Sequence, residues 1–337
     1  ISPLAFYAFL IFMITVDLAV VDKRYFREES YRRKTDRSYF APTEADQAIL
    51  KDKSSYRVYS LNPQSPFSFM SDAKPSYLHK SIGGYHGAKM RRYQDFVDSC
   101  FYRQLQEFIT LAREGNFDFT NLGAFNMLNI KYIPYGPKAE NIITNRHANG
   151  NAWFVREVME AGSPAEELER TCTIDTKSTA VIDRSSFSVP QAGADSTAII
   201  TLMKYTPNHL SYESNGQSDG LAVFSEVYYP KGWVATIDGS PADILRADYI
   251  LRALKIPGGK HKIEFQFAPK AYTVGNKVTM ASSWIVLVVL LLGITFDTLA
   301  PGRGADGRVT WYATAVVITV LAILSLLIHD YAHALAA

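Results

Sequence analysis

The stretch LAVFSEVYYPKGWVATIDGSPADILRADYILRALKIPGGKHKIEFQF (221–267) decides the fold class of the second half of the chain. It contains strand-like segments at 221–229, 233–237, 248–256 and 261–267, and the last alternates apolar and polar residues as a half-buried strand does. Asp238-Gly239 and residues 257–260 provide turn signals between these segments. Five to seven short strands without helices predict a small antiparallel β-sandwich over residues 186–269, of the jelly-roll or carbohydrate-binding type.

The region upstream of this sandwich, residues 22–185, mixes strand and helix patterns. Apolar residues recur at spacings of three and four from Ala88 to Arg113, which predicts an amphipathic helix that ends at Gly115. Residues 56–61 and 151–159 read as strands, and Ser163 followed by Pro164 reads as a capped helix start. We therefore expect an α+β domain over residues 22–185.

Three apolar runs at the chain ends have the length of membrane spans. They predict transmembrane helices at residues 1–21, 282–300 and 309–328, because a bilayer core takes about 20 apolar residues in a helix. Asp17 and Asp297 lie within two of these runs, and a carboxylate inside a membrane is a functional candidate unless it reaches the interface. Because the chain begins at Ile1, at the edge of such a run, we expect it to be the C-terminal piece of a longer multi-pass protein.

Charge and cysteine content exclude several classes of function. The 35 Lys and Arg residues nearly balance the 33 Asp and Glu residues, so the net charge of +2 gives no field for nucleic-acid binding. Cys100 and Cys172 are too few for a cysteine-based zinc cluster, and they can form one disulfide or remain two buried thiols. His329 and His333 lack the glutamate and the third ligand of a zinc helix. We expect no cofactor and no metal in this chain.

A glycine-rich turn that leads into a helix, SIGGYHGAKMRR (81–92), is a candidate anion or phosphate site. Backbone N–H groups and the positive end of a helix dipole favour an anion, and several cations crowd this end. The alternative is that these are solvated side chains on a helix that starts slightly later. The candidate residues are Tyr85, His86, Lys89, Arg91 and Arg92.

A second candidate site lies in one strand-turn-strand unit. Aromatic rings offer flat apolar faces to a sugar, and carboxylates accept hydrogen bonds from its hydroxyl groups. The packing of a sandwich core uses the same residue types. The candidate glycan-contact residues are Glu226, Tyr228, Tyr229, Trp233 and Asp238.

These motifs occur together in an order that resembles one known family. The stretches are VDLAVVDKRYF (16–26), SIGGYHGAKMRRYQ (81–94), FNMLNIKYI (125–133), NAWFV (151–155), TPNHLSYES (206–214), 221–239 and 246–269. The chain resembles the C-terminal part of bacterial YfhO-type membrane proteins, which are similar to GT-C-type glycosyltransferases.

The resemblance implies a multi-pass protein of the bacterial plasma membrane with its large domain outside the cytoplasm. It also implies a polyprenyl-phosphate-linked sugar and a surface glycopolymer as partners, besides the lipid bilayer, with the catalytic loop outside this chain. The seven basic residues between Lys23 and Arg37 favour the opposite, cytoplasmic orientation. Three hypotheses follow: part of a membrane glycosyltransferase, a non-catalytic carbohydrate-binding or scaffold module, and an accessory of a lipid-sugar transporter.

Overall fold

The computed structural model describes residues 3–25, 40–190, 193 and 195–299. Contacts divide the chain into two compact units whose segments interleave along the sequence. The first unit takes residues up to 54, 58–85 and 132–144, and the second takes residues 55–57, 86–131 and the chain from 145 onward.

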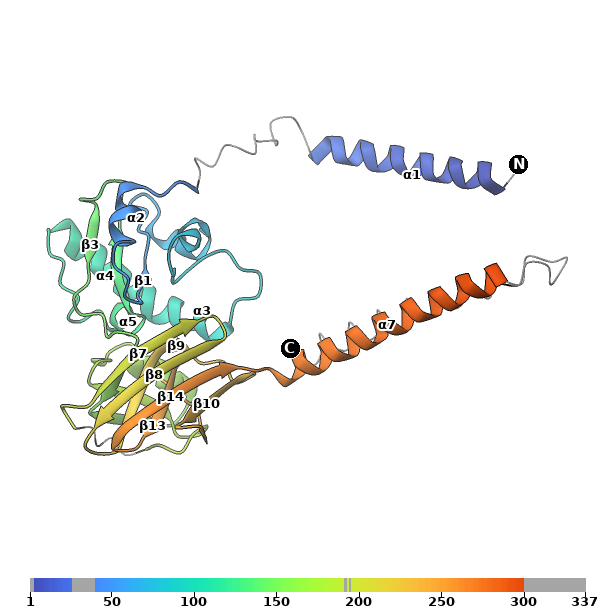
Figure 1. The fold of residues 1–337 in the computed structure, drawn as a ribbon. Helices are drawn as coiled ribbons and strands as arrows, with labels where there is room; N and C mark the ends of the chain where they lie inside the picture. Colours follow the sequence, from blue (N-terminus) through green and yellow to red (C-terminus); the bar gives the residue numbers. More distant parts are fainter. Residues whose placement is uncertain (1–2, 26–39, 191–192, 194, 300–337) are drawn as a thin grey trace. The chain divides into compact units, whose positions relative to one another are not determined.

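The second unit contains a sandwich of two antiparallel sheets (Figure 1). One sheet has the strand order β11-β10-β14-β8-β7, and the other has the order β12-β13-β9-β4. The strands of the first sheet are β7 (Ile199–Thr206), β8 (His209–Gly216), β10 (Trp233–Ile237), β11 (Ser240–Ala242) and β14 (Gly259–Phe267). Those of the second are β4 (Ala152–Val155), β9 (Gly220–Val227), β12 (Leu245–Ala247) and β13 (Leu251–Ile256).

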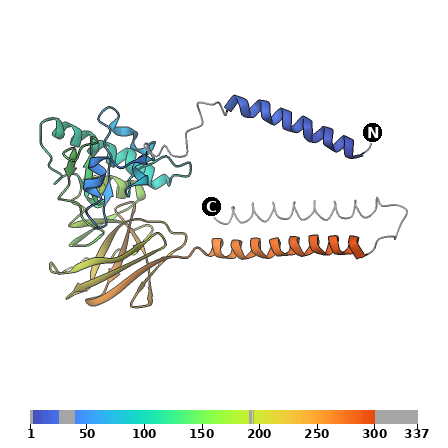
Figure 2. The same ribbon diagram turned by 45° about the horizontal axis from the view of Figure 1, so that its top comes forward.

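The core of the sandwich forms where the two sheets face each other. Ile263 and Phe265 of β14 are fully buried, as the alternation in the sequence predicted. The rings of Tyr212, Phe224 and Phe265 meet edge to face, with centroids 4.8 to 6.1 Å apart. Figure 2 shows the long strands β7, β8 and β14 of one sheet from a second side.

The rest of the second unit is α+β. Its helices are α3 (Arg91–Phe96), a π-helical turn (Val97–Phe101), α4 (Tyr102–Arg113), α5 (Gly123–Met127) and α6 (Pro164–Thr171). Strands β5 (Glu157–Ala161) and β6 (Thr179–Asp183) pair in parallel. The helical run from Arg91 to Arg113 confirms the predicted amphipathic helix, with Leu105 and Phe108 buried on its inner face.

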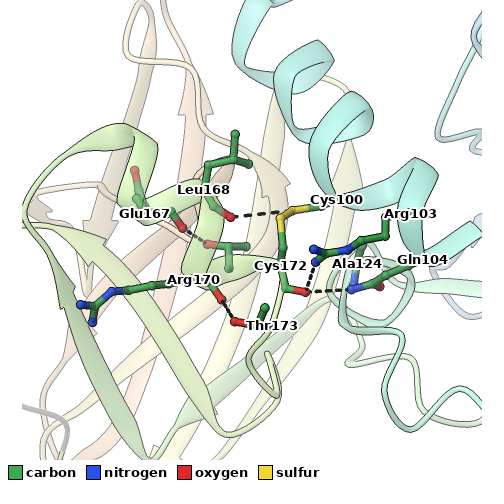
Figure 3. Close-up of a disulfide and its surroundings, with 10 residues drawn as sticks. Cys100, Arg103, Gln104, Ala124, Glu167, Leu168, Arg170, Cys172 and Thr173 are labelled. Carbon is green, nitrogen blue, oxygen red and sulfur yellow. Dashed lines mark hydrogen bonds between the residues drawn. A yellow bond between two sulfur atoms is a disulfide. The ribbon is translucent and has the colours of Figure 1, made fainter.

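A disulfide joins Cys100 in the π-helical turn to Cys172, which caps the C-terminal end of α6 (Figure 3). The two Cα atoms lie 5.1 Å apart. Arg103 and Gln104 donate hydrogen bonds of 2.9 and 3.3 Å to the carbonyl oxygen of Cys172, and Gln104 also accepts one from the Ala124 N–H. The sequence allowed either one disulfide or two buried thiols, and the structure shows the disulfide.

The first unit contains α2 (Glu44–Ile49) and most of the sheet β1-β2-β3, of which Arg57, Ile130 and Lys131 belong to the second unit. The strands are β1 (Arg57–Val58), β2 (Ile130–Pro134) and β3 (Ile142–Thr144), and two 3-10 helices span Pro66–Met70 and Lys74–Tyr77. Thr43 and Asp46 form a capping box at the start of α2, because the side chain of each accepts a hydrogen bond from the backbone N–H of the other.

Two terminal helices complete the described chain, α1 (Pro3–Tyr25) and α7 (Lys270–Leu299). Within the described ranges, no helix combines the length and the apolar character needed to cross a membrane. The prediction of three transmembrane helices is therefore wrong. It rested on the length of the apolar runs alone. In α1 the uncharged part ahead of Asp17 has about 14 residues and is roughly 21 Å long, whereas a hydrocarbon core is about 30 Å thick. The predicted span at 309–328 lies outside the described residues.

Candidate functional site

A polar cluster at one end of the sandwich brings together Glu226, Trp233 and Arg252. The Arg252 guanidinium lies over the Trp233 ring, 4.0 Å from its centroid, and its Nε donates a 3.0 Å hydrogen bond to the carbonyl oxygen of Val227. Glu226 lies in a β-bulge, because Leu251 of β13 pairs with Val227 of β9 whereas Arg252 pairs with Phe224. A bulge re-aims the side chains that it contains, so the bulge determines where the Glu226 carboxylate lies.

Arg57 fixes this carboxylate from β1. One terminal nitrogen of Arg57 donates hydrogen bonds of 2.7 Å to the Ser225 hydroxyl and 2.9 Å to the Leu128 carbonyl oxygen. The other lies 3.4 Å from Glu226 Oε1. The side chains of Arg57 and Glu226 are 17% and 15% exposed, so the pair is partly shielded but reachable from solvent.

Two buried polar atoms of this cluster lack a hydrogen-bond partner among the described residues: the Tyr212 hydroxyl and Nη1 of Arg252. Burial, and then the nearby Glu226 carboxylate, raise the pKa of the Tyr212 hydroxyl. Burial lowers the pKa of Arg252, whereas Glu226 raises it. Because unpaired buried polar atoms are costly, a ligand hydroxyl that reached them would be stabilised. Burial, and then the nearby Glu226 carboxylate, also raise the pKa of the Tyr205 hydroxyl. We refer to Arg57, Tyr205, Tyr212, Glu226, Trp233 and Arg252 as the sandwich-end cluster.

The predicted glycan-contact residues do not form one group. Glu226 and Trp233 lie in the sandwich-end cluster, whereas the Tyr228 ring packs edge to face on Phe187 at 5.9 Å and its backbone N–H bonds to Ile250. Tyr229 is half-buried beyond the end of β9. Asp238 follows the other end of β10, about 16 Å from Trp233 along the strand, and accepts from His261 at 2.6 Å.

The predicted anion-site residues are divided between the two units, with Tyr85 in the first and the other four in the second. Arg91 pairs with Asp95 at 2.9 Å. Arg92 lies over the Tyr249 ring at 4.6 Å, with one nitrogen 3.7 Å from Glu167. His86 accepts a hydrogen bond from the backbone of Ala88, and Lys89 is exposed.

Sequence reasoning missed a buried charge network in the second unit. Glu167 and Asp183 are fully buried, and the guanidinium of Arg246 lies 2.8 Å from a Glu167 oxygen and 3.1 Å from an Asp183 oxygen. Asp248 accepts from the Val181 N–H at 2.9 Å, and burial raises its pKa to about 8. The signal in the sequence was RADY (246–249), a charged tetrapeptide between apolar strands.

No metal centre emerges from residues 3–25, 40–190, 193 and 195–299, since no group of three or more His, Cys, Asp or Glu side chains there could hold a metal ion. Asp17 lies in α1 and Asp297 in α7.

The fold and the cluster define a β-sandwich module with a charged, aromatic end. Residues 190–279 match the family described as bacterial membrane protein YfhO, and this match confirms the resemblance to a YfhO-type protein. The matched segment holds β7 to β14 and five of the six residues of the sandwich-end cluster, namely Tyr205, Tyr212, Glu226, Trp233 and Arg252. No curated protein and no solved structure matches the chain.

Proposed function

We propose that this chain is the C-terminal portion of a membrane glycosyltransferase-like protein that uses a polyprenyl-phosphate-linked sugar to modify a cell-surface polymer. Within that protein, the sandwich-end cluster holds the polymer. The observation that carries the proposal is the half-buried Trp233 ring beneath the Arg252 guanidinium, with the Glu226 carboxylate close by.

The chemistry of the cluster suits a sugar. The CH faces of a pyranose pack on aromatic rings, while its hydroxyl groups both donate and accept hydrogen bonds. Trp233 and the exposed Tyr205 offer rings, Glu226 offers an acceptor, and Arg252 offers a donor. Arg57 binds the Glu226 carboxylate, which suits a hydrogen-bond acceptor better than a proton-transfer group. We therefore assign binding to this chain and seek the catalytic carboxylate outside it.

The disulfide supports an extracytoplasmic location. Disulfides persist in oxidising compartments and are rare in the reducing cytosol. Ser218 lies exposed in the turn between β8 and β9. A cysteine introduced there, in the full-length protein, should react with a membrane-impermeant maleimide in intact cells. Labelling only after lysis would place the sandwich in the cytoplasm and remove lipid-linked sugars on the outer surface from the proposal.

Retention of purified surface glycopolymer by the full-length protein tests the binding role. We expect Trp233→Ala to lower retention of the glycopolymer about tenfold. The packing of a sugar ring on an aromatic face contributes on the order of 1 kcal/mol, and the contact between Trp233 and Arg252 is lost as well. Val234→Ala is the matched control, because Val234 is the next residue of β10 and its exposed side chain points to the other face. Equal retention by both variants would contradict the proposal.

The second candidate function is a non-catalytic carbohydrate-binding or scaffold module of a membrane protein. The pairing of Glu226 with Arg57 favours it, because this arrangement binds rather than transfers protons. Incubation of the full-length protein with a radiolabelled polyprenyl-phosphate sugar and the polymer separates the two functions. Transfer of label supports the glycosyltransferase, whereas polymer retention without transfer supports the scaffold.

A further inference from the structure

The first unit contains a cleft of about 340 Å³ that the proposed function does not use. Residues from the start of α2, the two 3-10 helices and the segment after β2 line it. Its volume is within the range of small-molecule sites in proteins. At this cleft lies an Asp–His pair, in which His79 Nε2 is 2.8 Å from Asp46 Oδ1 and the His79 side chain is only 3% exposed.

The capping box of α2 fixes the orientation of Asp46. Its Oδ2 accepts hydrogen bonds from the N–H and the hydroxyl of Thr43, at 2.9 and 2.8 Å, which leaves Oδ1 for His79. Burial alone would raise the pKa of Asp46, but the hydrogen bonds from Thr43 and His79 outweigh it and lower the pKa. The carboxyl group is therefore ionised and can only accept hydrogen bonds.

This geometry determines the tautomer of His79. Because Asp46 can only accept, the proton of the neutral imidazole is on Nε2, and Nδ1 is left as an acceptor. Within the described part of the chain, Nδ1 makes no hydrogen bond. Asn62 lines the same cleft, and its Oδ1 accepts from the Gln64 N–H while its amide nitrogen has no partner among the described residues. The cleft thus presents one oriented acceptor and one donor.

The charges in the cleft narrow the class of ligand. Asp46 and Asp72 contribute two carboxylates against the single ammonium group of Lys74, so the cleft does not favour a phosphate or another anion. Pro63, Pro75 and Leu78 add apolar surface. An uncharged ligand with hydroxyl groups and CH faces fits both features. We propose that this cleft is a second ligand site, for a neutral polyhydroxylated ring such as a single sugar unit, with a ligand hydroxyl donating to His79 Nδ1.

Two substitutions separate a binding role of His79 from a structural one. The amide nitrogen of Gln in His79→Gln takes the place of Nε2, so it keeps the bond to Asp46 and removes the acceptor at Nδ1. The shorter His79→Asn places its amide near Nδ1 and loses the bond to Asp46. If His79 binds a ligand, His79→Gln should weaken binding roughly 3- to 10-fold with an unchanged melting temperature. His79→Asn should lower the melting temperature and retain more of the binding.

Saturation-transfer NMR on the full-length protein measures this, with methyl α-glucoside and methyl α-N-acetylglucosaminide as probes. All variants carry Trp233→Ala, so that the sandwich-end cluster does not contribute and a failure here is distinct from a failure of the proposed function. Loss of the glycoside signal in His79→Gln supports the proposal. An equal signal with and without His79→Gln, no signal in either protein, or displacement of the probes by inorganic phosphate would each overturn it.

Discussion

Removal of the Cys100–Cys172 disulfide tests how the second unit is held together. The bond closes a loop across 72 positions of the chain. The entropy of closing such a loop in the unfolded chain corresponds to about 4.4 kcal/mol at 25 °C, and measured effects are commonly 2–4 kcal/mol. We expect the larger part of this value to be lost on reduction. For a domain of this size the melting temperature should fall by roughly 10 °C.

The assay is thermal unfolding of the full-length protein, followed by tryptophan fluorescence with and without a reductant. The double variant Cys100→Ala/Cys172→Ala is the control. Its melting temperature should match that of the reduced protein and should not change when the reductant is added. Alkylation and mass measurement show how many thiols are free in each sample. If the fully reduced protein melted within about 2 °C of the oxidised one, the loop-closure reasoning would be refuted.

Three further predictions concern buried polar groups. Glu167→Gln should cost about 3 kcal/mol in a urea titration, because Arg246 loses one of its two buried carboxylates and keeps only the charge of Asp183; a loss below about 1 kcal/mol would contradict the network. Burial raises the pKa of Asp248 to about 8 in the folded state, so the folded state holds a proton that the unfolded state releases, and stability from this group falls as pH rises from about 4 to 8. Asp248→Asn should therefore flatten the dependence of unfolding free energy on pH between 5 and 8, and an unchanged slope would show that another group is responsible. Tyr212→Phe removes a hydroxyl without a partner, so stability should change by less than about 0.5 kcal/mol while glycopolymer retention falls several-fold; retained binding would exclude the hydroxyl from the site.

Strand β14 was accessible to sequence reasoning because only one of its faces is buried. In β14, Ile263 and Phe265 alternate with polar residues in the sequence, and in the structure these two apolar residues are the buried ones. Strand β4 was harder, since Ala152–Val155 pairs with β9 across about 70 residues of intervening chain, and a short edge strand does not encode its partner. The sequence left the pairing of Cys100 with Cys172 undecided for the same reason. Two cysteines show that a disulfide can form, but not that the fold brings them together.

The candidate site shows a different limit. Trp233 and Asp238 are close in the sequence, but a strand rises about 3.3 Å per residue, so five positions separate them by most of the sandwich length. Arg252 is far from Trp233 in the sequence and lies directly over its ring, and Arg57 reaches Glu226 from yet further away. Proximity in the sequence therefore selected two residues of the cluster, Glu226 and Trp233, and three residues that lie outside it, Tyr228, Tyr229 and Asp238. It offered no route to the two arginines.

The network around Glu167 and the sandwich-end cluster differ in whether their unpaired buried group can become neutral. Below a pH of about 8 the Asp248 carboxyl is neutral, so its unpaired oxygen carries no uncompensated charge. Arg252 cannot be deprotonated at physiological pH, although it is 4% exposed and its Nη1 has no hydrogen-bond partner among the described residues. The Val227 carbonyl oxygen, two ring faces and the nearby Glu226 carboxylate offset its charge. A hydroxyl oxygen that reached Nη1 would satisfy it, so such a ligand gains more free energy at Arg252 than at the network around Glu167.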